Sequence, residues 1–166
     1  MNPSIIVHGG AGKIEEELHP GYLAGVKAAA AAGHRVLLAG GSALDAVEAA
    51  VTAMENDPVL NAGVGSVLNR AGDIELDAII MDGQTLRVGA VAAVRGITNP
   101  VRLARLVAQE TDHCLLVGEG ARRFAEGLQG HHLACRLYAQ EVCAALRQAG
   151  LPAQARPVAD APAALG

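Results

Sequence analysis

Aromatic side chains are nearly absent from this sequence. Only Phe124, Tyr22 and Tyr138 are aromatic among 166 residues, and there is no tryptophan. Apolar residues nevertheless make up 51% of the chain, so a core has to be built from alanine, valine, leucine and isoleucine. Small side chains pack helices and strands closely, which predicts layered secondary structure in one domain that is large enough to bury a core.

The sequence also lacks a basic stripe, a long apolar run and a leader pattern. Lys and Arg number 13 against 17 Asp and Glu, and the formal net charge of −4 argues against a nucleic-acid partner. No window approaches the ~18 uninterrupted apolar residues of a membrane span. The first residues have neither the basic nor the apolar region of a secretory leader. We therefore expect a cytoplasmic protein without a membrane contact, whose three cysteines are reduced thiols.

Glycine, by contrast, is abundant at 20 residues, and several glycines lie at expected turns. The first part of the chain predicts a short buried strand at Ser4–His8, a helix from Pro20 to Gly40, and a second helix that Ser42 caps in a variant capping box with Asp45. The apolar faces expected on the two helices are formed by Leu23, Val26, Ala30 and Leu37, and by Leu44, Val47, Val51 and Met54.

The middle of the chain predicts an antiparallel hairpin. Apolar and polar residues alternate from Ile74 to Ile80, an Asp82-Gly83 turn follows, and a second apolar strand runs from Leu86 to Val94. Further on, Asn99 is expected to cap a helix that reaches about Gln109, before a short buried strand at Cys114–Val117 and a helix through Phe124. Mixed helices and strands with an antiparallel pair indicate an α+β fold rather than a repeating βαβ unit.

The composition changes near Gly127. We expect residues 1–126 to form the domain core and residues 127–166 to form a flexible linker, with at most a weak helix at Leu133–Ala149. The last stretch, from Gly150 to Gly166, is rich in alanine and proline and has no periodicity, which is typical of a mobile segment.

Several patterns suggest sites but lack a necessary part. The loop after His8 does not complete a dinucleotide-binding fingerprint, because the third glycine is missing after Gly10-Ala11-Gly12, and a plain tight turn remains the alternative. His8 itself fits a core histidine. His131, His132 and Cys135 have no second ligand pair at zinc-site spacing, and Asp73, Glu75 and Asp77 fit the solvated face of a strand.

Asn61 is the strongest candidate for a chemical role. It follows Pro58 and precedes Ala-Gly-Val-Gly, so its side-chain amide presents a donor and an acceptor from a rigid turn. A turn asparagine without a further role is the alternative reading of this residue alone.

Seven motifs between Ile5 and Gly120, in this order, resemble the α-chain of plant-type L-asparaginases (isoaspartyl aminopeptidases), which are N-terminal-nucleophile hydrolases. The motifs are HGGAG, SALDAVEAAV, NAGVGSVLN, ELDAIIMDG, GAVAAV, NPVRLAR and GEGA. The resemblance implies a four-layer αββα sandwich to which this chain contributes the α-subunit half. It also implies hydrolysis of L-asparagine and β-aspartyl dipeptides. Glycosylasparaginase shares this fold, but the absence of a leader and of tryptophan argues against that branch.

In that family the nucleophile is a threonine that begins a separate β-chain, which autocatalytic cleavage of a precursor releases. The resemblance therefore implies a cleavage point after Gly166, a β-subunit partner, and a heterotetramer made of two αβ units, although the residues AALG before that point differ from the family's usual ones. The four threonines between Thr52 and Thr111 lie inside the chain and have no free amine. A catalytically inert fragment or scaffold that only pairs with a partner chain is the alternative.

The resemblance also assigns site residues. Asn61 would support the nucleophile, and Gly9 and Gly10 would lie beside the substrate. No organic cofactor is implied. A structural sodium ion would be bound by backbone carbonyls of six residues, namely Met54, Glu55, Asp57, Leu60, Ala62 and Val64.

Overall fold

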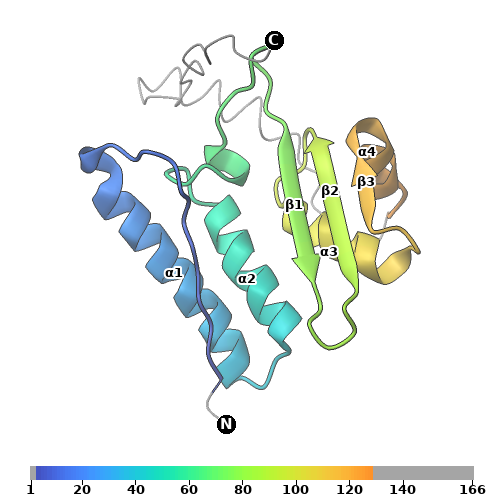
Figure 1. Cartoon of the computed structure of the whole chain (residues 1–166), viewed down its shortest axis with the longest axis horizontal. Helices are drawn as coiled ribbons and strands as arrows, with labels where there is room; N and C mark the ends of the chain where they lie inside the picture. Colours follow the sequence, from blue (N-terminus) through green and yellow to red (C-terminus); the bar gives the residue numbers. More distant parts are fainter. Residues whose placement is uncertain (1–2, 129–166) are drawn as a thin grey trace, which may run out of the picture.

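A computed structural model describes residues 3–128. They form two parts that lie side by side, a helical pair and a three-stranded sheet backed by two further helices (Figure 1). Three predictions concern residues outside this range. They are the linker of residues 127–166, of which only the first two positions are described, the weak helix at Leu133–Ala149, and the cleavage point at Gly166. No helix within residues 3–128 is long and apolar enough to cross a membrane.

The helical pair consists of α1 (His19–Leu38), which a short 3₁₀ turn η1 (Glu16–Leu18) precedes, and α2 (Ala43–Glu55). The capping box predicted for α2 is confirmed. Asp45 N donates to Ser42 Oγ at 3.1 Å, and Ser42 N donates to Asp45 Oδ2 at 3.1 Å. Two of the N–H groups left unpaired at this helix start are therefore satisfied within four residues of sequence.

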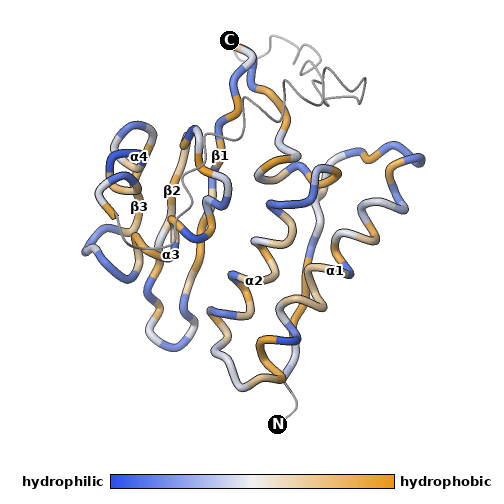
Figure 2. Tube along the Cα trace, turned by 180° about the vertical axis from the view of Figure 1, so that it is seen from behind, coloured by the Kyte–Doolittle hydropathy of each residue, from blue (hydrophilic) through white to orange (hydrophobic). Residues whose placement is uncertain are grey.

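The face with which α1 packs on α2 differs from the predicted one. The buried residues of α1 are Gly25, Ala29 and Gly33, while Leu23 is 53% exposed. A Cβ at Gly33 would lie 2.7 Å from the Ala46 carbonyl oxygen, so the two backbones approach too closely for a larger residue. Small residues along both helices give them the pale hydropathy colours of Figure 2. The prediction was based on the largest apolar side chains of α1, whereas the residues that contact α2 are the smallest ones, because the helices pack closely.

The sheet contains β1 (Leu76–Met81), β2 (Val88–Val94) and β3 (Leu115–Val117), in the order β1-β2-β3. β1 and β2 pair antiparallel, which confirms the predicted hairpin. The turn is wider than the two-residue turn expected at Asp82-Gly83, because Asp82 N donates to Arg87 O across a loop. The fold is mixed helix and strand, as predicted for an α+β protein.

α3 (Pro100–Glu110) links β2 to β3, which runs parallel to β2, so one βαβ unit is present that the sequence pattern did not indicate. Together with α4 (Gly118–Gly127), α3 covers one face of the sheet. The core under this face is contributed by strands and helices alike, and its fully buried side chains include Val91, Val94, Val101, Leu103 and Val107.

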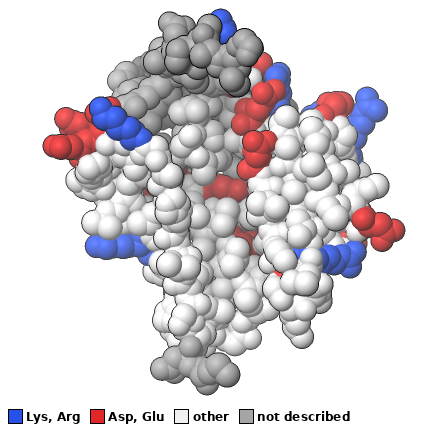
Figure 3. Space-filling view, in the orientation of Figure 1, with Lys and Arg blue, Asp and Glu red and all other residues white. Residues whose placement is uncertain are grey.

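The opposite face of the sheet is uncovered within residues 3–128. Ile79 is 70% exposed, and Met81, Leu115 and Val117 are about half exposed. The prediction that Cys114–Val117 forms a buried strand is therefore wrong, since β3 is an edge strand of the described sheet and its alternate residues face outward. In Figure 3 this face is mostly uncharged.

Ser4–His8 was also expected to be a buried strand and is not one. The segment runs along the helical pair (Figure 1) without pairing to any strand of the described chain, and Ile6 is 96% exposed. Ile5 still packs on the helical pair, because its Cδ1 lies 2.3 Å from the position of a Cβ at Gly33. The β-branched pattern correctly indicates extended backbone, but the described residues supply no neighbouring strand.

Candidate active site

A cavity of about 540 Å³ lies between the C-terminal end of α2, the loop after His8 and strand β1. It collects residues from four distant stretches of sequence, which are His8–Gly10, Val51–Glu55, Leu60–Val67 and Glu75–Ile79, with Pro100 and Val101 at the start of α3. The predicted site residues Asn61, Gly9 and Gly10 all line this cavity. The fold thus brings together residues that the motifs place more than 50 positions apart.

The loop after α2 is shaped by backbone packing. Val59 N donates to Asp57 Oδ1 at 2.9 Å, which forms a local Asx turn. The loop then enters a 3₁₀ turn, η2 (Gly63–Gly65), where Gly63 has φ +51° and a Cβ would lie 2.1 Å from the Glu55 carbonyl oxygen. Only glycine tolerates both that conformation and that approach. The glycines of this motif, Gly63 and Gly65, consequently fix the path of the chain after Ala62.

Asn61 is an exposed residue in this loop, and its two side-chain atoms differ in role. Oδ1 accepts a hydrogen bond from Val67 N at 3.1 Å, which closes the loop. Nδ2 has no partner within residues 3–128 and is free to donate toward the cavity. The structure supports the turn role of Asn61 directly and leaves the side-chain NH₂ group available for chemistry.

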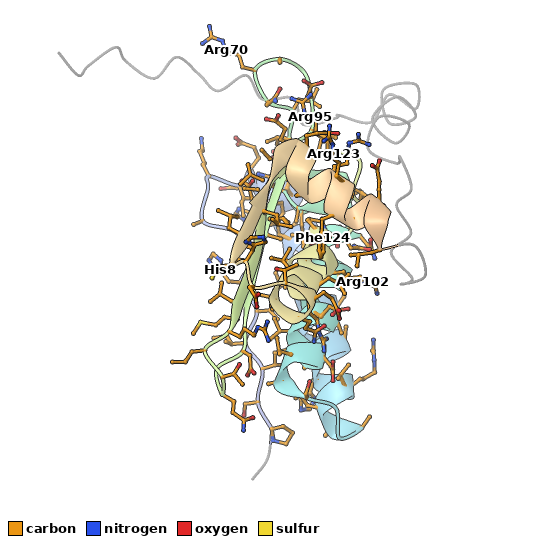
Figure 4. All side chains as sticks on the ribbon, turned by 90° about the vertical axis from the view of Figure 1, so that its right-hand side faces the viewer. His8, Arg70, Arg95, Arg102, Arg123 and Phe124 are labelled. Carbon is orange, nitrogen blue, oxygen red and sulfur yellow. The ribbon has the colours of Figure 1, made fainter. Side chains whose placement is uncertain are left out.

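His8 lies at the cavity rather than in the core, so the core-histidine reading is wrong. The residue is exposed, and its Nδ1 accepts from Gly10 N at 3.4 Å. Figure 4 shows His8 beside the sheet, on the side away from Arg102 and Phe124. Gly9 packs tightly on α1, because a Cβ there would lie 2.5 Å from Val26 Cγ1.

Glu75, just before β1, and Asp77, in β1, form one wall of the cavity. Both carboxylates make defined hydrogen bonds within the protein, whereas the sequence pattern indicated only a solvated strand face. The pKa of Glu75 is lowered by hydrogen bonds from Arg95 and from Asn69 Nδ2, the latter at 2.8 Å. Asp77 Oδ1 accepts from Ala93 N at 2.7 Å, where the β1–β2 register shifts and Ala93 has φ +51°. These bonds hold both carboxylates in fixed positions at the cavity wall.

Glu55 is a cavity residue whose side chain the sequence reasoning missed. It is the only charged residue classed as buried between residues 3 and 128, with 3% exposure. Desolvation raises the pKa of its carboxyl group to about 7, against hydrogen bonds from Val101 N and Asn99 that lower it. The available signal was its position four residues after Val51, which places it on the core-facing stripe of α2.

Two of the six carbonyl groups predicted to hold sodium, those of Asp57 and Leu60, lie close to Gly65 in this loop. The carbonyl oxygens of Leu60, Asp57 and Pro58 would lie 2.0, 2.8 and 2.8 Å from a Cβ at Gly65, so three oxygens surround one small volume. Neutral carbonyl oxygens are donors that a hard cation accepts, so the chemistry of the predicted donor set suits sodium. Four of the six predicted residues, namely Met54, Glu55, Leu60 and Ala62, line the cavity, and Asp57 and Val64 do not. Within the described residues no group of His, Cys, Asp and Glu is arranged for a metal.

The cavity lining contains no activated nucleophile. Ser66 carries the only hydroxyl group among the described lining residues, and the one lining histidine, His8, already accepts a hydrogen bond from Gly10 through Nδ1. No hydrogen bond joins Ser66 to His8 in this part of the chain. The described residues therefore form a cavity with a free amide donor but without the hydroxyl–base pair that nucleophilic catalysis needs.

Residues 1–163 match the Asparaginase_2 family, described as Asparaginase, and the chain belongs to this family of N-terminal-nucleophile hydrolases. The chain is 61% identical over 126 residues to an isoaspartyl peptidase/L-asparaginase of Xenopus laevis, a match that covers 76% of the chain and 41% of that relative.

Two further relatives give the same picture. The chain is 52% identical over 129 residues to the isoaspartyl peptidase/L-asparaginase of Homo sapiens, across 77% of the chain and 42% of the relative. It is 56% identical over 123 residues to a plant-type L-asparaginase of Thermococcus kodakarensis, across 74% of the chain and 40% of the relative. The matches thus span about two fifths of the length of these relatives.

Proposed function

We propose that this chain is the α-subunit part of an amidohydrolase that hydrolyses L-asparagine and β-aspartyl dipeptides through an N-terminal threonine on a separate β-chain. The observation that carries the proposal is the cavity where Asn61, Gly9 and Gly10 meet while the lining has no activated nucleophile. Relatives named for these two activities support the substrate class.

In the proposed reaction, the β-chain threonine enters the cavity and its own α-amino group takes the hydroxyl proton. The oxygen attacks the side-chain carbonyl carbon of the substrate, the C–N bond breaks, and ammonia or an amine leaves with that proton. Water then hydrolyses the acyl-enzyme and releases aspartate. The part of this chain is to orient the reacting groups, with Asn61 Nδ2 donating to the nucleophile or to the oxygen on which negative charge develops.

The open sheet face supports a β-chain partner. Ile79, Met81, Leu115 and Val117 are exposed together on a face that α3 and α4 do not cover. A second sheet packed on these residues would complete the four-layer sandwich, because the two apolar inner faces would then bury each other. Pairing of two such αβ units into a heterotetramer is part of the same proposal.

We also include sodium in the proposal. The carbonyl oxygens of Asp57 and Leu60, with Glu55 nearby at Gly63, would hold the ion, and its positive charge would stiffen the loop that carries Asn61. The six expected carbonyl ligands remain Met54, Glu55, Asp57, Leu60, Ala62 and Val64. No organic cofactor enters the proposed reaction.

The deciding experiment uses the full-length protein in which this chain occurs. Mass spectrometry of the purified protein should find two chains, the second beginning with threonine, and coupled assays should detect ammonia from L-asparagine and free aspartate from a β-aspartyl dipeptide. A single uncleaved chain that hydrolyses neither substrate would instead favour the alternative, an inert fragment or scaffold that only pairs with a partner.

A further inference from the structure

The Glu55 side chain joins the two parts of the molecule. Its Oε1 accepts from Val101 N at 3.0 Å, and its Oε2 accepts from Asn99 Nδ2 at 3.1 Å. Asn99 stands at the N-cap of α3 but makes no side-chain cap of its own, contrary to the sequence-based expectation. The first turn of α3 is therefore capped by a carboxylate from the end of α2, where the helix dipole and two N–H groups favour it.

The backbone of the same residue shapes the cavity loop. Glu55 is the last residue of α2, and its carbonyl oxygen occupies the space that a Cβ of Gly63 would need. Asn61 lies between these two contacting residues. One residue is thus bound to α3 through its side chain and packed against the loop through its backbone.

We propose that Glu55 is a positioning residue, whose carboxylate anchors the loop of residues 56–65, and hence Asn61, to the first turn of α3. α3 is a rigid reference because Val101, Leu103 and Val107 are fully buried against the sheet. Loss of the carboxylate leaves the buried Val101 N–H without a partner, which drives the end of α2 away from α3. The catalytic consequence of this anchoring rests on the proposed function, whereas the anchoring itself does not.

The interface between α2 and α3 also provides a matched control. At its other end, Arg105 donates to Glu48 Oε2 at 2.9 Å and to Asp45 Oδ1 at 2.7 Å. Glu48 does not line the cavity, and it also pairs with Arg102 Nε at 3.5 Å, so Glu48→Gln weakens the same helix–helix interface without removing a hydrogen bond to Val101 N or Asn99. A general loosening of the interface and a specific anchoring role therefore make different predictions.

The test is hydrogen exchange measured by mass spectrometry on the full-length protein as wild type, Glu55→Ala, Glu55→Gln and Glu48→Gln. In Glu55→Ala we expect exchange in peptides from residues 56–66 and across Val101 to accelerate by about 10-fold or more, because the buried hydrogen bonds to Val101 N and Asn99 are lost. Glu55→Gln keeps an oxygen for Val101 N but presents an NH₂ group to Asn99, so it should accelerate the loop less. Glu48→Gln should leave the loop unchanged.

Unchanged loop exchange in Glu55→Ala, or equal acceleration in Glu48→Gln, overturns the proposal. If Glu55→Ala does not fold, Glu55→Gln decides, and a loop that exchanges as in wild type then overturns it. Kinetics form the second arm, in which kcat of Glu55→Gln should fall about 10- to 100-fold with KM within about twofold, and Glu48→Gln should match wild type. Faster exchange with unchanged kcat would also overturn the positioning role. If the wild-type protein has neither hydrolase activity, the proposed function is contradicted, but the hydrogen-exchange experiment still tests the anchoring by Glu55.

Discussion

At the scale of single residues, Asn61 separates a structural task from a chemical one within one side chain. Its Oδ1 closes the loop through Val67 N, and its Nδ2 is free at the cavity. Asn61→Ala removes both atoms, whereas Asn61→Asp keeps an oxygen for Val67 and removes the N–H donor. Asn61→Asp therefore tests the chemical task while the loop-closing hydrogen bond is kept, and Asn61→Ala tests both tasks together.

We expect both variants, made in the full-length protein, to lower kcat for L-asparagine by about 10²- to 10³-fold, the usual cost of losing one donor to a developing oxyanion. Autocleavage should slow as well, since the same threonine hydroxyl performs it. Steady-state assays on fully cleaved enzyme give the measurement. Near-normal turnover in Asn61→Asp would reduce Asn61 to a turn residue.

The motifs predicted which residues meet at the cavity, but not all of their bonds. Asn61, Gly9 and Gly10 could be predicted to line the cavity because turn preferences and family motifs involve residues that are adjacent in the sequence. The hydrogen bond from Val101 N to Glu55 joins residues 46 positions apart, and no local sequence pattern predicts that partner. His8 was misplaced for the same reason, because its surroundings are set by β1 rather than by its own apolar segment.

At the scale of elements, substitution of a helical glycine by alanine should change stability in opposite directions at two positions. One glycine lies where α1 and α2 approach closely, and the other lies in open space on α4. A Cβ at Gly33 would meet the Ala46 carbonyl oxygen at 2.7 Å, whereas a Cβ at Gly120 in α4 has nothing within 4 Å. Helix propensity alone favours alanine at either position by about 1 kcal/mol. At Gly33 we expect the backbone clash to outweigh that gain.

Gly33→Ala should thus lower the free energy of unfolding by about 1–3 kcal/mol, and Gly120→Ala should raise it by about 0.5–1 kcal/mol. Urea unfolding of the full-length protein followed by circular dichroism measures both. Stabilisation by Gly33→Ala would show that α1 and α2 do not pack as tightly as described.

The capping box of α2 gives a prediction for pH. The pKa of Asp45 lies below its ordinary 3.8 because the Ser42 hydroxyl and Arg105 donate hydrogen bonds to it. A lowered carboxyl pKa adds stability above the pKa of the unfolded chain, and this stability is lost as pH falls through the folded value. Asp45→Asn should therefore cost about 1 kcal/mol near neutral pH, a typical cap contribution.

The difference between wild type and Asp45→Asn should shrink as pH drops well below 3.8. Unfolding free energies at a series of pH values, compared at each pH, isolate the contribution of Asp45 from that of other carboxyl groups. A difference that stays constant down to acid pH would mean that the carboxylate charge has no part in the cap.

At the scale of the whole molecule, the uncovered sheet face governs how this chain behaves alone. Ile79, Met81, Leu115 and Val117 expose an apolar surface, and β3 is a free edge within residues 3–128. Surfaces and edges of this kind associate with each other. We expect the isolated 16.9 kDa chain to self-associate in size-exclusion chromatography with light scattering.

Ile79→Lys should shift that equilibrium toward monomer, because it places a charge on the open face, while Leu23→Lys on the exposed side of α1 should not. A wild-type chain that is cleanly monomeric and melts cooperatively would contradict the half-enzyme interpretation.

The fold as a whole was predictable where sequence signals are local and unpredictable where they are not. The capping box of Ser42 and Asp45 correctly predicted the start of α2. The alternation of apolar and polar residues in β1 correctly predicted the hairpin. The parallel pairing of β3 with β2 depends on α3 crossing the sheet, and the unpaired Ser4–His8 segment depends on a strand that the described residues do not contain. Periodicity reports which face of an element is apolar, but not what covers that face.

The cap that Glu55 provides for α3 has a consequence for the order in which the chain assembles during synthesis. Val101 is made 46 residues after Glu55, which at ribosomal rates of about 5–20 residues per second corresponds to a delay of roughly 2–9 s. The α1–α2 hairpin can form during that delay from neighbouring segments, with its last residue still in water. When α3 is made, its first turn binds the Glu55 carboxylate that is already present at the end of α2. The loop of residues 56–65 becomes fixed only at that later step.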